Sequence, residues 1–220
     1  MTTKIAVFDL DETLIQGDSS VLWTHYLWDK QIINDPQFIA EDSRMMAQYN
    51  AGILDMPAYL AFSMQALAGI PTEQVDIWLD DFVNTIILPN IYPAARQCID
   101  DYRQRHIPVI IISATVSFIV KKIAAKLHAD FAIGIDMQVI NNSYSGTING
   151  IASFKAGKVK RLTQWLSQQR VSDAEIVFYT DSANDLPMCY FADQVITINA
   201  DPRLAEIAME QQWTQLQWKI

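Results

Sequence analysis

Four short apolar segments recur along the chain, and the first three of them end in polar residues. They span residues 4–10, 108–113, 175–181 and 194–198. Short runs rich in Val, Ile and aromatic residues that stop at a polar side chain are typical of buried strands. Helical patterns follow the second and third runs. Strands that alternate with helices predict an α/β fold with a mostly parallel sheet covered on both faces.

Two further segments need a separate interpretation. Residues 131–150 alternate in polarity around a polar centre at 141–143, which predicts an antiparallel hairpin hanging from the sheet. Ser172 and Glu175 have the spacing of a capping box, but residues 176–179 after them are β-branched and aromatic. We therefore interpret this segment as the beginning of a strand.

The segment between the first two strands is too long to be a single crossover helix. Its apolar residues follow a helical pattern from about residue 16 to residue 88. The pattern is interrupted at Pro36, Gly52, Pro71 and Pro89. The sequence thus predicts two domains, an α/β core formed by residues 1–15 and 89–220 and a helical cap formed by residues 16–88.

Composition and charge narrow the class of protein. The chain has 220 residues, half of them hydrophobic, which is enough for a substantial core. Its formal net charge of −9 repels phosphate backbones, so we expect no nucleic-acid partner. The longest aliphatic run, 109–112, is far shorter than the ~20 residues of a membrane span, and the N-terminus lacks signal-peptide features. We expect a cytoplasmic protein without a membrane partner. Cys98 and Cys189 form no metal-binding or redox motif.

Carboxylates gather at the predicted carboxyl ends of the strands. Asp9 and Asp11 lie two residues apart where the first strand ends, so extended geometry points both to one side, with Thr13 in the same phase. Asp181 and Asp185 follow the third strand. In a parallel sheet such ends converge on one crevice, where ligands bind. Three or four carboxylates in one place require a cation, and an all-oxygen set selects Mg²⁺. The sequence therefore predicts a magnesium site at this edge of the sheet.

The same crevice contains groups suited to a phosphate. Ser113 ends the second strand, and with Ala114 it precedes a predicted helix whose free N–H groups can bind phosphate oxygens. The charge of Lys158 can neutralise and orient the remaining oxygens.

At these positions the sequence resembles the haloacid dehalogenase-type phosphatases. The four motifs of that family are matched, in order, by Asp9, Asp11 and Thr13, by Ser113, by Lys158 and by residues 180–185. The first and fourth motifs are the most specific, and the resemblance spans the chain. It implies a Rossmann-like parallel-sheet core with a C1-type cap inserted after the first strand. The family's lysine opens a helix, which Gly157 and the helical pattern after it favour for Lys158, with Lys155 as the alternative.

The resemblance also implies how the residues act. Asp9 is the nucleophile that takes up the phosphoryl group, and Asp11 protonates the leaving alkoxide and then activates water. Asp11 must carry a proton at the start of the reaction. The Mg²⁺ ligands are Asp9, the backbone carbonyl of Asp11 and Asp181, with Asp185 as a further ligand or as a partner of the ligands. Thr13 steadies the loop.

A helical insertion at this point resembles the cap of phosphoserine phosphatases and of some histidinol-phosphate phosphatases. The resemblance implies a small phosphorylated metabolite of either kind as the substrate. Asp18 stands where the phosphoserine enzymes have a Glu that holds the substrate amine, and Arg44 is the only arginine in the insertion that could hold a carboxylate. Trp23 could line a pocket for a ring-bearing substrate, although its helical spacing is more typical of packing inside the cap.

Two other functions use the same residue types. A phosphotransferase would form the same phosphoaspartate and pass the phosphoryl group to an alcohol instead of water. A receiver-type switch also combines acids, a hydroxyl and a lysine, but its accepting Asp lies on a later strand and it lacks a large insertion after the first strand. We therefore expect an enzyme, acting as a monomer or a homodimer.

Overall fold

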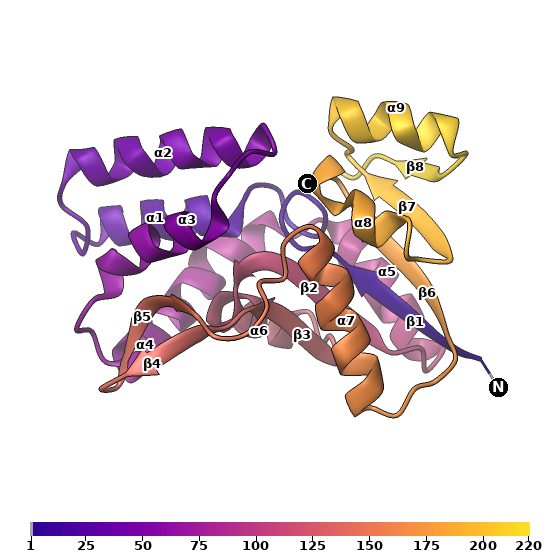
Figure 1. Ribbon diagram of the computed structural model, residues 1–220, viewed down its shortest axis with the longest axis horizontal. Helices are drawn as coiled ribbons and strands as arrows, with labels where there is room; N and C mark the ends of the chain where they lie inside the picture. The colour runs from indigo at the N-terminus through magenta and orange to yellow at the C-terminus, as the bar shows by residue number, and fades with distance from the viewer. Residues whose placement is uncertain (1) are drawn as a thin grey trace.

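A sheet of parallel strands forms the centre of the molecule (Figure 1). The structure is a computed structural model, and it describes residues 2–220. Within these residues, six strands lie in the order β3-β2-β1-β6-β7-β8, and every neighbouring pair is parallel. The strands are β1 (Thr3–Phe8), β2 (Val109–Val116), β3 (Phe131–Ile135), β6 (Ala174–Thr180), β7 (Gln194–Ile198) and β8 (Thr214–Leu216). The predicted parallel α/β fold is confirmed.

Alternate residues of β1 enter two different cores, which explains why this strand is apolar throughout. Ala6 and Phe8 belong to one buried cluster, and Ile5 and Val7 belong to another. Successive side chains of a strand point to opposite faces, so both faces of the sheet are covered. The first cluster includes residues of α5 (Pro93–Gln104) and α6 (Ser117–Lys126), and the second includes residues of α7 (Ala156–Gln168), α8 (Leu186–Cys189) and α9 (Pro202–Glu210).

The segment between β1 and β2 forms a group of helices, here called the cap, beside one end of the sheet (Figure 1). Its helices are α1 (Ser19–Asp29), α2 (Pro36–Asn50), α3 (Met56–Ser63) and α4 (Thr72–Phe82), followed by the short turns η1 (Met64–Leu67), η2 (Val83–Ile87) and η3 (Leu88–Asn90). Asp18, Asp35 and Asp55 each accept a backbone N–H at the beginning of α1, α2 and α3. Short polar side chains at these positions satisfy the free N–H groups of a helix and fix where it begins.

The predicted helix breaks fall at the ends of these elements. Pro36 opens α2, and Gly52 follows α2 with a φ of 71°, a conformation that glycine adopts without strain. Pro71 precedes α4, and Pro89 lies in η3. No helix within residues 2–220 is long and apolar enough to cross a membrane.

The hairpin prediction for residues 131–150 is correct only for its second part. Phe131–Ile135 is β3, an outer strand of the main sheet that pairs in parallel with β2. The hairpin consists of β4 (Met137–Ile140) and β5 (Ser143–Ile148), joined through Asn141 and Asn142, which have φ values of 49° and 62°. β3 is an edge strand that begins exposed, with Phe131 38% exposed, and ends buried, so it lacks the continuous burial of the central strands.

Three other boundaries test the sequence analysis. β6 begins at Ala174, so the interpretation of the capping-box spacing as a strand is confirmed. β2 continues to Val116, three residues beyond the predicted end, and the next helix begins only at Ser117. β8 was not predicted, because its three residues are exposed and do not form an apolar run.

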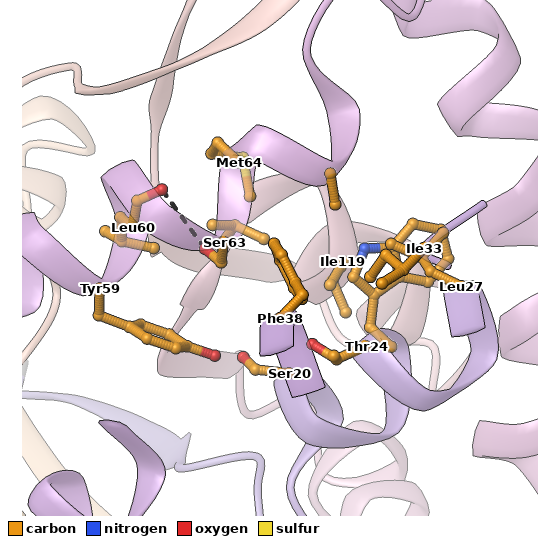
Figure 2. Close-up of a pocket in the computed structure, with 13 residues that line it drawn as sticks. Ser20, Thr24, Leu27, Ile33, Phe38, Tyr59, Leu60, Ser63, Met64 and Ile119 are labelled. Atoms are coloured by element: carbon orange, nitrogen blue, oxygen red, sulfur yellow. Dashed lines mark hydrogen bonds between the residues drawn. The ribbon is translucent and has the colours of Figure 1, made fainter. Parts of the chain in front are cut away.

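A small cavity of about 20 Å³ lies where the cap packs against Val116 of β2 and Ile119 of α6 (Figure 2). It is bordered by the hydroxyl groups of Ser20 and Tyr59 and by apolar side chains such as Phe38. Trp23 also lines it and stacks on the Tyr26 ring at 5.4 Å between centroids. A cavity of this size holds about one water molecule, so it is a packing gap and not a metabolite site.

Asp42, on α2, is a buried carboxylate with only long hydrogen bonds. Its residue is 3% exposed, and its Oδ1 accepts from Thr24 Oγ1 at 3.5 Å and from the Tyr59 hydroxyl at 3.4 Å. Burial is the largest cause that raises the pKa of Asp42 to about 6, and the Tyr59 hydrogen bond and His25 offset it in part. The ionised form of Asp42 therefore destabilises the folded cap.

We expect Asp42→Asn to stabilise the protein near neutral pH. Because the folded-state pKa is raised, the folded protein holds the proton more tightly, and stability falls as the pH rises from 3.8 to about 6. The variant lacks this loss, which amounts to about 1–3 kcal/mol above pH 6. Urea unfolding of both proteins across this range measures it, with Asp29→Asn on the exposed surface as a control. A variant no more stable than the parent near pH 7 contradicts the prediction.

Candidate active site

The carboxyl ends of β1, β2 and β6 lie side by side because β1 is hydrogen-bonded to both other strands. Phe8 lies opposite Ile111 on one side and Tyr179 on the other. Asp9 follows Phe8, and its N–H donates to the Tyr179 carbonyl at 2.9 Å, which continues the ladder by one residue. Asp181 follows the end of β6. The two acids, 172 positions apart in the chain, are thus brought to the same edge of the sheet.

Lys158 connects two of the predicted acids. Its Nζ donates to Asp9 Oδ1 and to Asp185 Oδ2, both at 2.6 Å, and the Thr180 hydroxyl donates to the same Asp185 oxygen at 2.8 Å. Lys158 and Asp185 are each 2% exposed and Asp9 is 7% exposed. Charges at this depth are stable only when they are paired and hydrogen-bonded. Asp185 is therefore an ion-pair partner of Lys158.

Glycine at the beginning of α7 sets the position of Lys158. A Cβ atom on Gly157 would lie 1.9 Å from the Ala152 carbonyl oxygen, so only glycine lets the first turn of α7 approach this closely. Lys155 lies outside the cluster, because its Nζ donates to the Gly52 carbonyl of the cap at 2.7 Å. The structure thus brings Lys158, and not Lys155, to the acids.

Asp11 is held by three donors from two parts of the molecule. Its Oδ1 accepts from the Ser19 N–H of α1 at 2.6 Å. Its Oδ2 accepts from Ser113 Oγ at 3.1 Å and from Thr115 Oγ1 at 2.9 Å. Ser113 and Thr115 are two residues apart in β2 and so point to the same face, with the half-buried Ala114 between them. Asp11 consequently lies where the core and the cap meet.

Thr13 lies behind the acids and has no exposed surface. It is fully buried, and its hydroxyl donates to Asp181 Oδ1 at 3.0 Å. The backbone carbonyl of Asp181 accepts from the Asp201 N–H at 2.7 Å. Thr13 therefore fixes the orientation of a carboxylate instead of contacting a substrate.

The cluster contains more negative charge than its lysine offsets. Burial is the main cause that raises the pKa of Asp9 to about 7, with Lys158 lowering it and the charges of Asp185 and Asp11 raising it further. Burial, then Asp9 and Asp185, raise the pKa of Asp181 well above its usual range. Carboxylates held in this way gain stability from a proton or from a bound cation.

The donor atoms suit a hard divalent cation. Asp9 and Asp181 offer carboxylate oxygens, and Asp11 offers its backbone carbonyl. Residues 2–220 contain no group of three or more His, Cys, Asp or Glu side chains arranged as a complete metal cage. Asp185 Oδ2 already accepts from Lys158 and from Thr180. Mg²⁺ is commonly held by one or two carboxylates and completes its shell with water and phosphate oxygens, so the smaller donor set fits it.

A cavity of about 550 Å³ lies over these residues, between the core and the cap. Its acidic wall is formed by Asp9, Asp11, Glu12, Asp18, Asp181 and Asp201. The cap contributes Val21, Met46 and Tyr49, and the beginning of α9 contributes Arg203. The volume is that of a small-molecule site.

Asp18 both caps helix α1 and lines the cavity. Its Oδ1 accepts from the N–H groups of Ser20 and Val21 at 2.8 and 3.1 Å and so caps α1. Burial, followed by the charge of Asp11, raises the pKa of Asp18 to about 8. Its other oxygen is available to the cavity.

Arg44 and Trp23 are not brought to the cavity. Arg44 donates from Nε and from a terminal nitrogen to the two carboxylate oxygens of Glu41, both at 2.7 Å, on the exposed surface of the cap. This local pair, one helical turn apart, directs the guanidinium away from the acids, so the expectation that Arg44 holds a substrate carboxylate is wrong. Trp23 packs against the Phe82 ring at 5.1 Å inside the cap.

Tyr49 and Arg203 are among the cavity residues that were not predicted from the sequence. The Tyr49 ring packs 5.6 Å from the Phe154 ring, and its carbonyl accepts from the Asn184 side chain at 3.2 Å. Burial and then the acids of the cluster raise the pKa of its phenol, so Tyr49 is a hydrogen-bond donor. Arg203 is exposed at the first turn of α9. Neither residue belongs to a motif, and only the folding of distant segments onto one cavity makes them visible.

Comparison with known proteins agrees with this geometry. Residues 6–189 match the family described as haloacid dehalogenase-like hydrolase. A histidinol-phosphatase of Neisseria meningitidis serogroup C is 31% identical over 98% of this chain and 99% of its own length. The phosphoserine phosphatase SerB2 of Mycobacterium tuberculosis is 27% identical over 94% of this chain, which spans only 47% of that protein. A solved protein with unknown function from Bordetella pertussis Tohama I has a TM-score of 0.90 at 29% identity, over 98% of this chain and 99% of that one.

The chain belongs to the haloacid dehalogenase-like hydrolase family. Within this family it is a phosphoric monoester hydrolase. The family resemblance and the enzyme class predicted from the motifs are both confirmed.

We expect Lys158→Met to lower kcat/KM by at least about 100-fold, because it removes the cation beside Asp9. Lys155→Met, the matched control, is expected to change it by less than about threefold, since Lys155 reaches a cap carbonyl and not the acids. Hydrolysis of p-nitrophenyl phosphate measures both, and circular dichroism shows whether each variant is folded. Equal losses in two folded variants contradict the assignment.

Proposed function

We propose that this chain is a Mg²⁺-dependent phosphatase that hydrolyses the phosphomonoester of a small amino alcohol through a phosphoaspartate on Asp9. Histidinol phosphate is the first candidate substrate. The proposal is carried by the buried contact of Lys158 with Asp185 and with Asp9, which lines the acidic cavity. This contact favours the ionised form of Asp9, which a nucleophile requires.

In the first step, a carboxylate oxygen of Asp9 attacks phosphorus, and the bond between phosphorus and the substrate oxygen breaks. Asp11 gives its proton to the leaving oxygen, so the products are an acyl phosphate on Asp9 and a free alcohol. Lys158 stays beside Asp9 and offsets the charge of the transferred group. The Ser113 hydroxyl and the Ala114 N–H would bind phosphoryl oxygens.

In the second step, water attacks the acyl phosphate and Asp11 takes a proton from it, which releases inorganic phosphate and regenerates Asp9. The place of Asp11 in the cavity wall supports both roles, and its three donors hold the carboxylate in one orientation. Mg²⁺, held by Asp9, Asp181 and the Asp11 carbonyl, would offset the charge of the carboxylates and the phosphate.

The charge of the cavity supports a substrate with a cationic group. Six carboxylates line it against one arginine. Asp18 uses one oxygen to cap α1, and the other can accept from an ammonium or an imidazolium. Histidinol phosphate carries both groups beside its phosphorylated alcohol. The nearly full-length similarity to a histidinol-phosphatase supports the same choice.

Arg203 supports phosphoserine as a second candidate. Arg203 lines the cavity, and its guanidinium could bind a substrate carboxylate in the role that the sequence suggested for Arg44. The similarity to a phosphoserine phosphatase supports this candidate less, because the chain spans about half of that relative.

Asp9→Asn is expected to abolish turnover, a loss of at least about 1,000-fold, because an amide cannot form the acyl phosphate. In the parent protein, acid quenching during turnover of p-nitrophenyl phosphate should leave a phosphoryl group on the Asp9 peptide, detected by mass spectrometry. Chelation by EDTA should stop turnover and added Mg²⁺ should restore it. Phosphate on another residue, or full activity in EDTA, contradicts the mechanism. Formation of a glycerol phosphate when glycerol is added would favour the phosphotransferase alternative.

One variant tests each of the two candidate substrates, histidinol phosphate and phosphoserine. Asp18→Asn keeps an N-cap for α1 but removes the carboxyl group that a bound cationic substrate would hold ionised, so we expect kcat/KM for histidinol phosphate to fall by about 10–100-fold, and for p-nitrophenyl phosphate by much less. Arg203→Ala is expected to lower kcat/KM for phosphoserine alone. Equal low rates on both metabolites, unchanged in either variant, would show that these residues do not select the substrate.

A further inference from the structure

Thr115 is a buried hydroxyl at the point where β2, the cap and Asp11 meet. It is 3% exposed. Its Oγ1 lies 2.9 Å from Asp11 Oδ2 and 3.2 Å from the hydroxyl oxygens of both Ser19 and Ser20. One threonine thus contacts the carboxylate that is proposed to move protons and the first two residues of cap helix α1.

A local irregularity of the sheet places this hydroxyl. Between Ile112 and Val116 the pairing of β2 with β3 shifts, with three residues of β2 facing one residue of β3. The opposing residue is Gly134, where a Cβ atom would lie 2.6 Å from the Ser117 Cα and 2.8 Å from the Thr115 carbonyl oxygen. Bulges of this kind redirect side chains beside active sites.

The two hydroxyls on Asp11 Oδ2 are not equivalent. The Ser113 hydroxyl, which also accepts from the Thr115 N–H at 3.0 Å, is the one proposed to turn toward a phosphate oxygen. Once it turns, Thr115 is the side chain that still holds Oδ2, while the Ser19 N–H holds Oδ1. The orientation of Asp11 in the substrate complex then depends on Thr115.

We infer that Thr115 is a positioning residue that aims the Asp11 carboxylate at the leaving oxygen and couples that aim to cap helix α1. The inference rests on the proposed phosphatase mechanism. The coupling runs through Ser20, whose hydroxyl faces the Tyr59 hydroxyl of α3 across the small cap cavity (Figure 2). A shift of α1 relative to the core would move two of the contacts of Thr115 together.

The choice of leaving group separates positioning from a merely structural role. An alkyl alcohol leaves only when it receives a proton, whereas p-nitrophenolate leaves without one. Because kcat/KM covers the reaction up to phosphorylation of the enzyme, a misaimed Asp11 should lower it for an alkyl phosphate and spare it for p-nitrophenyl phosphate. Damage to the fold or to phosphate binding would lower both values alike.

The test compares Thr115→Val, which keeps the shape and removes the hydroxyl, with Thr115→Ser, which keeps the hydroxyl. We expect Thr115→Val to lower kcat/KM for histidinol phosphate, an alkyl phosphate, by about 10–100-fold. We expect it to lower kcat/KM for p-nitrophenyl phosphate by less than about threefold. Thr115→Ser should stay within about threefold of the parent on both. Thermal unfolding of both variants shows whether the fold is intact.

Equal losses on the two phosphates, no loss on either, or a Ser variant as impaired as the Val variant overturn the inference while the parent enzyme still hydrolyses phosphomonoesters. A parent protein that hydrolyses neither compound with Mg²⁺ overturns the proposed function, and the inference with it.

Discussion

One buried ammonium between two buried carboxylates is the contact on which the rest of the site depends. Lys158 binds Asp9 and Asp185 with both distances at 2.6 Å, and all three side chains are almost fully enclosed. Removing such charges from water is unfavourable unless they meet with good geometry and further hydrogen bonds. The contact therefore forms only when the end of β1, the first turn of α7 and the turn after β6 are all correctly placed relative to one another. Gly157 is what allows that helix turn to come close enough.

The same cluster holds more carboxylates than its one lysine can neutralise, and this excess of negative charge suits it to bind a cation. Lys158 pairs with Asp9 and Asp185, and Asp11 and Asp181 lie nearby without a lysine partner of their own among the described residues. Burial with mutual repulsion raises the pKa of Asp9 and of Asp181. A set of oxygen atoms with excess negative charge is prepared for a cation, and the cation in turn admits a phosphate. Perturbed acids of this kind concentrate at functional sites because function, and not stability, selects them.

The cap completes the site with groups that have structural duties of their own. Asp18 caps α1 and also lines the cavity, and the Ser19 N–H at the beginning of that helix binds Asp11. Tyr49 ends α2 and packs on the core through Phe154. The beginning of a helix supplies free N–H groups at a fixed place, so the cap can orient a core carboxylate through backbone alone. Asp42 differs from these groups, because it is a buried acid whose hydrogen bonds are too long to stabilise its charge well.

The sequence by itself determined β1, β2, β6 and β7 and the acids that follow β1 and β6, because local periodicity fixes which residues end a parallel strand and parallel strands share one edge. It favoured Lys158 over Lys155 without excluding Lys155. It could not determine which arginine reaches the cavity: Arg44 closes a local pair with Glu41 on the cap surface, and Arg203 arrives from the other end of the chain. It also could not distinguish β3 from a hairpin arm, since the pairing of this short segment with β2 is a contact between distant parts of the chain. Those outcomes depend on how segments far apart in the chain pack against one another, and the tertiary structure alone decided them.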